Sequence, residues 1–169
     1  MLNYILIAFL KFLNVILKIF GKQGGNVTGK IAKKINNINF SNHTTWEDKI
    51  IEGNSFKFNE HDEIEPGYQY GGEAANLDFV KDFSYDFVLS SHCIEHLANP
   101  IQGLSEWVRV LKNDGLLVLV VPHKDGTFDH LRPVTTLGHL VDDFNKNIDE
   151  GDLTHLDEIL SLHDLGRDP

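Results

Sequence analysis

The chain of 169 residues has one cysteine, Cys93. It cannot form a disulfide within itself, which excludes the small disulfide-framed secreted class and favours a reducing, intracellular compartment. It also lacks a low-complexity tract, and its 41% hydrophobic and 24% charged residues are ordinary for a packed globular protein. A chain of this length predicts one domain with a sizeable core.

Acidic residues are absent from the first 46 positions, which carry six lysines and so a charge of +6. From Glu47 onward the chain holds all 25 acidic residues and the remaining nine of the 15 basic ones, a charge of −16. The part of the chain from Glu47 onward would repel a polyanion, so we expect no nucleic-acid partner.

The first 22 residues predict an amphipathic helix. In "MLNYILIAFLKFLNVILKIF" the polar positions Asn3, Lys11, Asn14 and Lys18 fall on one narrow stripe at helical pitch. Two lysines on that stripe suit a helix lying at a membrane surface through residues 1–20 better than one spanning the membrane. The alternative is a helix that docks on the domain.

Residues 23–46 are expected to form a basic linker. Gly24, Gly29 and Lys30 match the spacing of a phosphate-binding P-loop, but Ile31 stands where that motif needs a hydroxyl. The motif also needs a preceding strand, whereas a helix is predicted there. A flexible linker is therefore the better interpretation.

A strand, helix and strand alternate in the middle of the chain, within the domain assigned to residues 47–169. "YDFVLS" (85–90) and "LLVLVVP" (116–122) are short apolar runs typical of strands buried in a parallel sheet. Between them Pro100 suits a first helical turn, with Asn99 as its cap. Ligands of such sheets bind beyond the carboxyl ends of the strands, so residues 90–92 and 122–125 should face one crevice.

Three segments carry a resemblance to a known family. "GGEAANL", "YDFVLSSHCIEHLANP" and "WVRVLKNDGLLVLVVP" together resemble the middle of a class I S-adenosylmethionine-dependent methyltransferase of the type 11 family. The resemblance implies an α/β fold with a Rossmann-like, mainly parallel sheet and S-adenosylmethionine as cofactor. It implies that the cofactor is held by Glu73 and Ala74 on the adenine side and by Ser90, Ser91 and His92 at a strand end.

The chain also departs from that family. No glycine-rich loop upstream matches the family's first motif, and no acidic residue is assigned to the ribose; "SFKFNE" ends in Glu60, but nothing around it fixes a role. The printed sequence stops before the final antiparallel strands of the fold. We therefore predict a truncated version, and a non-catalytic remnant that serves as an interaction module is the alternative function.

The histidines around Cys93 allow two other readings. His92 to His96 is an H-x-x-E-H string, the signature of a zinc hydrolase in which two histidines on one helical face hold the metal. Ser91 or Cys93 beside a histidine is a candidate nucleophile, although no G-x-S-x-G turn surrounds either. The strand that runs straight into this turn favours a cofactor crevice instead, and no metal ligands are assigned.

The sequence thus predicts an enzyme that transfers a methyl group from S-adenosylmethionine to a small-molecule or glycan acceptor. His92 or His123 would be the base that removes the acceptor's proton. The substrate-binding candidates follow the second strand and are Asp125, Thr127, Asp129 and Arg132. The segment around them, "HKDGTFDHLRPVTTLGHLVDDF", is similar to a subgroup found in glycan and cell-surface biosynthesis. We expect a cytoplasmic protein, peripheral at the membrane where its first helix binds lipid, and leave its oligomeric state open.

Overall fold

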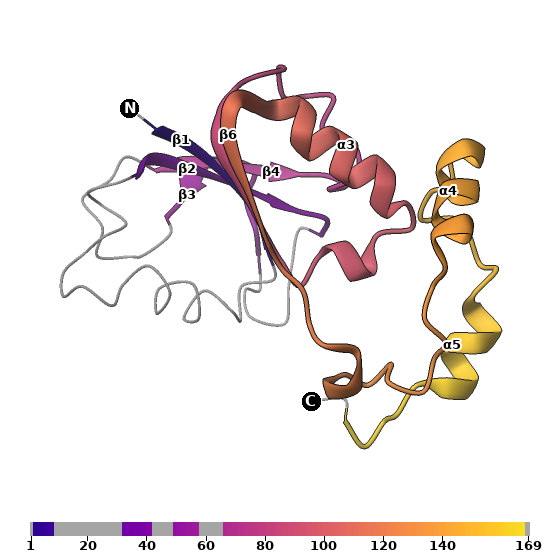
Figure 1. Cartoon of the computed structure of the whole chain (residues 1–169). Helices are drawn as coiled ribbons and strands as arrows, with labels where there is room; N and C mark the ends of the chain where they lie inside the picture. Colours follow the sequence, from indigo (N-terminus) through magenta and orange to yellow (C-terminus); the bar gives the residue numbers. More distant parts are fainter. Residues whose placement is uncertain (1, 9–31, 42–48, 58–65, 168–169) are drawn as a thin grey trace.

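The computed structural model describes residues 2–8, 32–41, 49–57 and 66–167. Their strands form one six-stranded sheet in the order β3-β4-β2-β1-β5-β6 (Figure 1). The strands are β1 (Leu2–Ala8), β2 (Ala32–Asn39), β3 (Gly53–Phe56), β4 (Gly67–Gly71), β5 (Tyr85–Ser91) and β6 (Leu111–Val120).

The sheet is mainly parallel. β1 pairs in parallel with both β2 and β5, β2 pairs with β4, and β5 pairs with β6. β3 runs antiparallel to β4 at one edge. The prediction of an α/β fold with a mainly parallel sheet is confirmed.

The predicted N-terminal helix and linker are wrong where the structure describes them. Leu2–Ala8 is strand β1, and β2 lies inside the segment that was expected to be a linker. Both strands pair inside the sheet, so a domain boundary near residue 47 would cut it. The physical reason is that a short apolar run such as "LNYILIA" fits a central parallel strand as well as a helix, and distant pairing partners decide the outcome. Residues 9–31, which hold the rest of the predicted helix and the P-loop-like spacing, lie outside the described residues.

The predicted order of strand, helix and strand is confirmed, but the expectation that both strands are buried is wrong for β6, which is an edge strand with Leu116 and Leu119 55% and 39% exposed. Helix α3 (Pro100–Val110) begins with Pro100 in its first turn, and Asn99 Oδ1 accepts a hydrogen bond from the Gln102 N–H at 3.1 Å. β6 follows without a loop, but the ladder opposite β5 skips from Leu111 to Leu116. The residues between them, 112–115, lie within β6 and mark an irregularity in its register with β5.

The main core lies between α3 and one face of the sheet. Trp107 is completely buried there, and its indole N–H donates to the Ala74 carbonyl at 2.9 Å. The buried members of this core are Ile38, Ala74, Leu77, Val80, Tyr85, Val88, Trp107, Val110 and Leu111. α3 is thereby fixed both to the sheet and to the loop that follows β4.

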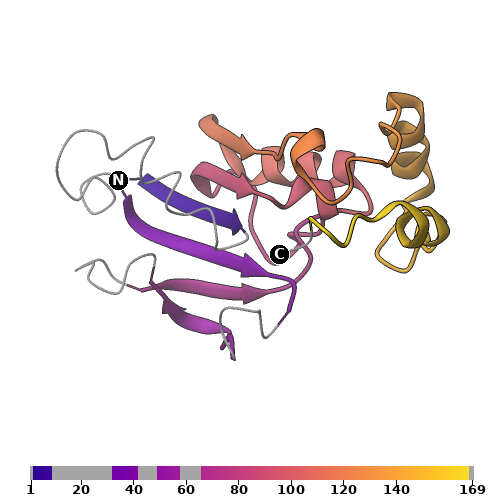
Figure 2. The same ribbon diagram turned by 90° about the horizontal axis from the view of Figure 1, so that it is seen from below.

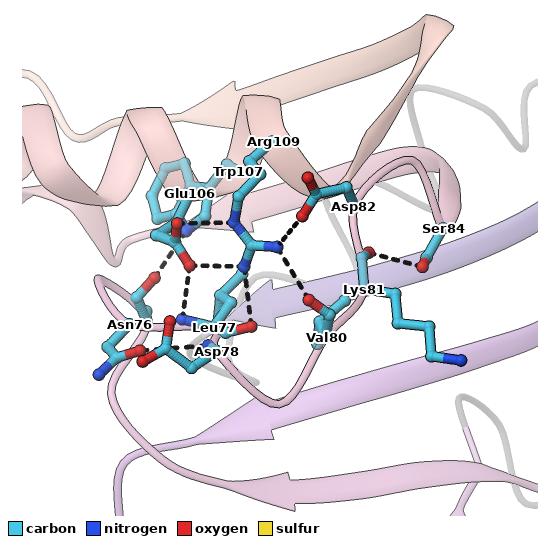
Figure 3. A network of polar contacts seen from close by, with 11 residues as sticks. Asn76, Leu77, Asp78, Val80, Lys81, Asp82, Ser84, Glu106, Trp107 and Arg109 are labelled. Carbon is cyan, nitrogen blue, oxygen red and sulfur yellow. Dashed lines mark hydrogen bonds and ion pairs between the residues drawn. The ribbon is translucent and has the colours of Figure 1, made fainter.

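A polar network holds the segment 77–82 against α3 (Figure 3). Arg109 donates to the Leu77 and Val80 carbonyls, both at 2.9 Å, and pairs with Asp82 and Glu106. Glu106 in turn accepts from the Leu77 N–H at 2.9 Å. One guanidinium thus satisfies backbone groups of a loop that has no regular secondary structure of its own.

The C-terminal helices lie beyond the carboxyl ends of the strands (Figure 2). They are α4 (Leu137–Lys146) and α5 (Leu156–Leu162). Asn99 Nδ2 donates to the carbonyls of Asp143 and Ile148, at 3.3 and 3.4 Å, and so joins the start of α3 to the end of α4. Within the described residues, the structure contains no helix whose length and apolar character would let it cross a membrane.

Candidate cofactor site

The sheet has a topological switch point at β1. The chain runs from β1 outward to β2 and β4, and then crosses back to β5 and β6 on the other side. Ile7 of β1 is level with Ile38 of β2 and Ser90 of β5, and Ala8 is level with Ser91. Open α/β sheets bind ligands at the carboxyl ends of the strands at this point.

Two buried polar atoms flank the end of β1. Ser91 Oγ and Asn39 Nδ2 have no hydrogen-bond partner within the described parts of the chain, and Ser91 is 1% exposed. Ile38 of β2, Ile7 of β1 and Ser90 of β5 lie side by side in the sheet, and Asn39 and Ser91 are the next residues of their strands. The side chains of Asn39 and Ser91 therefore project from the same face of the sheet, on either side of β1. Buried polar groups are nearly always paired, so these two atoms are available to bond a polar ligand; Asn37 Oδ1 and Asp129 Oδ1 are the other buried side-chain atoms without a hydrogen-bond partner in the described residues.

A cavity of about 400 Å³ opens at the carboxyl ends of β2 and β4, where Asn39 pairs with the lining residue Gly71. Its walls are formed by Phe40, Ser41, Ile50, Glu52 and Gly71. Glu52 Oε2 would lie 4.0 Å from a Cβ atom on Gly71, so this carboxylate stands next to a stretch of bare backbone. The size is in the range of small-molecule sites.

The ends of β5 and β6 lie as expected, and the described cavity lies elsewhere. β5 and β6 do end side by side, because the His92 N–H continues their ladder to the Val120 carbonyl at 2.9 Å. The described cavity, however, is not lined by Ser90 or Pro122, where a shared crevice was expected. It lies on the other side of β1, toward Gly71 and Glu73.

Glu73 lies two residues after β4, and Ala74 follows it with its side chain in the core. Glu73 Oε1 accepts a hydrogen bond from the Ala75 N–H at 3.2 Å. Burial raises the pKa of the Glu73 carboxyl, and the nearby Glu150 carboxylate acts in the same direction. A cation bound close by would relieve both effects.

His92 has a strained backbone at the tip of β5. Its φ of +49° is left-handed, which costs a non-glycine residue energy and is frequent at functional sites. Its Nδ1 lies 3.6 Å from Glu95 Oε1. His92 is thus held in position by its own backbone hydrogen bond and faces a carboxylate.

The zinc-hydrolase reading of residues 92–96 fails on geometry. That motif needs both histidines one turn apart on an α-helix, whereas His92 is left-handed and Ile94–His96 is a single 3-10 turn. No group of three histidine, cysteine, aspartate or glutamate side chains in the described part of the chain is arranged to hold a metal ion.

Cys93 is expected to be a poor nucleophile. Burial raises the pKa of its thiol to about 12, and the charges of Glu73 and Glu95 add to the shift. Since the thiolate is the reactive form, we expect the native protein to react with a disulfide reagent at about pH 8 at least about tenfold more slowly than the chain in denaturant. Equal rates in the two states would show that the thiol is accessible and ionised, and would reopen the nucleophile reading.

The predicted base His123 and the predicted substrate residues follow β6, and they differ in exposure and in their contacts. The side chains of His123 and Asp125 are 82% and 81% exposed, with His123 Nδ1 accepting from the Asp125 N–H at 3.4 Å. Thr127 Oγ1 donates to the Lys124 carbonyl at 2.8 Å. Arg132 pairs with Asp129 and Glu158, at 3.2 and 2.8 Å, so its guanidinium fastens this loop to α5. His123 and Asp125 are the members best placed to meet a ligand from solvent.

Sequence reasoning missed Asn39 and Glu52. Each acquires its place only through strand pairing: Asn39 ends β2, and Glu52 precedes β3 at the sheet edge. The signal that was available is "NFS", which begins at the last residue of β2. That signal was hidden because this segment was taken for a linker.

Residues 51–119 match a family profile described as a methyltransferase domain. This segment runs from the edge of the cavity through Glu73 and His92 to the end of β6. The resemblance to methyltransferases drawn from the sequence motifs is confirmed over these residues. No curated protein sequence matches the chain.

Two solved structures resemble the chain weakly. One is a crystal structure of the trans-methyltransferase CalH complexed with SAH, at 11% identity and a TM-score of 0.46, covering 68% of this chain and 30% of that one. The other is a complex between the Haloferax volcanii Trm112 methyltransferase activator and the putative methyltransferase, at 15% identity and a TM-score of 0.47, covering 95% and 58%. The chain therefore spans about a third to three fifths of the structures it resembles.

Proposed function

We propose that this chain binds S-adenosylmethionine at the carboxyl edge of its sheet and transfers the methyl group to a small-molecule acceptor. The observation that carries the proposal is the pair of unpartnered polar atoms, Asn39 Nδ2 and Ser91 Oγ, on either side of the end of β1. The methyltransferase-domain match over residues 51–119 supports it.

The residues present fit the nucleoside end of the cofactor. The cavity offers the Glu52 carboxylate, which accepts hydrogen bonds as ribose hydroxyls require, beside the side-chain-free Gly71. The apolar walls Phe40 and Ile50 suit a flat base. Glu73 and Ala74, which follow Gly71 in the chain, would hold its edge, and Ser90 and Ser91 would meet the part nearest β5.

The local charge favours a cationic ligand. Glu73 is kept partly out of water beside Glu150, and both its burial and that neighbour disfavour the ionised form. A sulfonium ion placed between β4 and β5 would stabilise the carboxylate by direct attraction. When bound, the cofactor supplies a methyl group on positively charged sulfur.

The protein's part in the reaction is then positioning and proton removal. Glu73, Ser90 and Ser91 would hold the cofactor, which would supply its methyl group to an oxygen or nitrogen of the acceptor and leave as a neutral thioether. The acceptor's proton goes to His92, whose place at the tip of β5 is fixed by its N–H bond to Val120. His123 on the neighbouring strand is the second candidate base.

The acceptor would enter from the side of the loop after β6. His123 and Asp125 are exposed there, and α4 and α5 border the same edge of the sheet. A glycan or cell-surface acceptor, a cytoplasmic location and a peripheral association with the membrane extend the same proposal. They rest on the sequence resemblance.

Calorimetric titration of the full chain with S-adenosylhomocysteine tests the proposal. We expect saturable binding with one site, weakened about two- to tenfold by Ser91→Ala, since one hydrogen bond contributes about 0.5–1.5 kcal/mol. Glu73→Ala should weaken binding by a similar factor or more, and Ser91→Trp should abolish it by filling the site.

Ser105→Trp is the matched control, because it places the same bulky side chain at an exposed position of α3, and it should bind like the wild type. Absence of binding at millimolar ligand would favour the interaction-module alternative. An affinity that is unchanged in all three site variants would show that the ligand binds elsewhere.

A further inference from the structure

Two histidines from different elements meet outside the proposed cofactor site. His139 lies in the first turn of α4, and His155 is the residue before α5. Their Nε2 atoms are 2.9 Å apart, and the two rings are nearly perpendicular, at 88°. They are sixteen positions apart in the chain, a spacing that does not predict a contact.

The two nitrogens are at hydrogen-bonding distance, and the same separation suits a shared metal ion. Imidazole nitrogens bind transition metals at about 2.0–2.1 Å, so two of them in neighbouring positions of one ion are about 2.9–3.4 Å apart, from a right angle to a tetrahedral one. The observed 2.9 Å matches the right-angled arrangement, which is typical of Cu²⁺ and Ni²⁺. Both side chains are about 40% exposed, so an ion has access from water.

The surroundings resemble the outer shell of a metal site. His155 Nδ1 lies 3.8 Å from Glu158 Oε2, and Glu158 is itself fixed by Arg132 at 2.8 Å. Metal-bound histidines commonly present their second nitrogen to such an anchored carboxylate, which orients the ring. Asp143 Oδ2 lies 3.3 Å from His139 Nε2 and adds negative charge beside the pair.

We propose that His139 and His155 form a two-imidazole binding site for a divalent transition-metal ion, with water in the remaining positions, which clips α4 to α5. The protein supplies two nitrogens and no third ligand, in keeping with the absence of any described three-residue metal group. Imidazole-rich sites favour Cu²⁺, Ni²⁺ and Zn²⁺ over the hard ions Mg²⁺ and Ca²⁺. This site does not depend on the proposed cofactor.

Titration of the tag-free full chain with Ni²⁺, followed by calorimetry, tests the site. We expect one ion per chain, and His139→Gln and His155→Gln should each weaken binding by roughly a hundredfold, because either change turns a two-point attachment into a single contact. Glutamine keeps a polar side chain of similar reach, and circular dichroism checks that each variant is folded.

His123→Gln is the control, since it removes one exposed imidazole and leaves the pair intact; its affinity should stay within about twofold of the wild type. Electron paramagnetic resonance of the Cu²⁺ form should show two coupled nitrogens, falling to one in either pair variant. If both pair variants bind Ni²⁺ as tightly as the wild type, the contact is a plain hydrogen bond between imidazoles and the proposal is wrong.

Discussion

Replacement of Trp107 by alanine is expected to lower the free energy of unfolding by about 3–5 kcal/mol. Trp107 is 0% exposed in the centre of the main core, and alanine would leave a cavity there while stranding the Ala74 carbonyl. A domain has a total stability of only about 5–15 kcal/mol, so the variant should unfold at much lower denaturant concentration. Equilibrium denaturation by urea measures the change.

Two further variants separate packing from hydrogen bonding at this position. Trp107→Phe keeps most of the apolar volume and loses the indole N–H, and we expect a smaller loss, about 1–3 kcal/mol. Val108→Ala is the matched control, because its side chain is 60% exposed on the same helix, and it should change stability by less than about 0.5 kcal/mol. A loss in Trp107→Ala no larger than in Val108→Ala would contradict the described core.

The second large effect is expected for Arg109→Met, at about 3 kcal/mol of lost stability. Methionine keeps the apolar stem but removes every contact to Leu77, Val80 and Asp82, and it leaves Glu106 as a buried charge without its cation. Arg109→Lys keeps the charge and loses the forked geometry, so it should recover only part of the loss. Urea denaturation of the three proteins at neutral pH measures both effects.

The pH dependence of stability gives an independent test of the pair of Glu106 and Arg109. Hydrogen bonds from Arg109 hold the pKa of Glu106 below its usual value of 4.5, against the opposing effect of burial. A carboxyl with a lower pKa in the folded state stabilises the protein above its unfolded pKa, and that stabilisation is lost as the pH falls below it. The stability difference between wild type and Glu106→Gln should therefore shrink between about pH 6 and about pH 3. A difference that stays constant over this range would show that the ionised form of Glu106 does not matter.

The middle of the fold was predictable because its signals are local. Asn99 and Pro100 specify where α3 begins, and the apolar runs 85–90 and 116–122 predict strands, although only the first proves to be well buried, since Leu116, Leu119 and Val121 are exposed at the sheet edge. The N-terminal strands were not predictable in the same way. "LNYILIA" carries no local mark that separates strand from helix, and its partners lie about 30 and 80 residues further along the chain.

In the candidate site, too, the residues with a local sequence signal were predictable and those placed by distant pairing were not. Ser91 and His92 were found because they end a recognisable strand, and Glu73 because it belongs to a recognisable motif. Asn39 and Glu52 depend on which strands lie side by side, and the contact between His139 and His155 depends on how α4 and α5 fold back on each other. Information of that kind is spread over distant residues, so no single stretch displays it.

Asn99 joins the start of α3 to the end of α4 through one side chain. Its one amide group serves two helices, since the oxygen caps the first turn of α3 while the nitrogen holds the carbonyls of Asp143 and Ile148 at the end of α4. A displacement of α4 would therefore disturb the same side chain that caps the first turn of α3. This cap closes the short segment that leads from His92 at the end of β5 into α3.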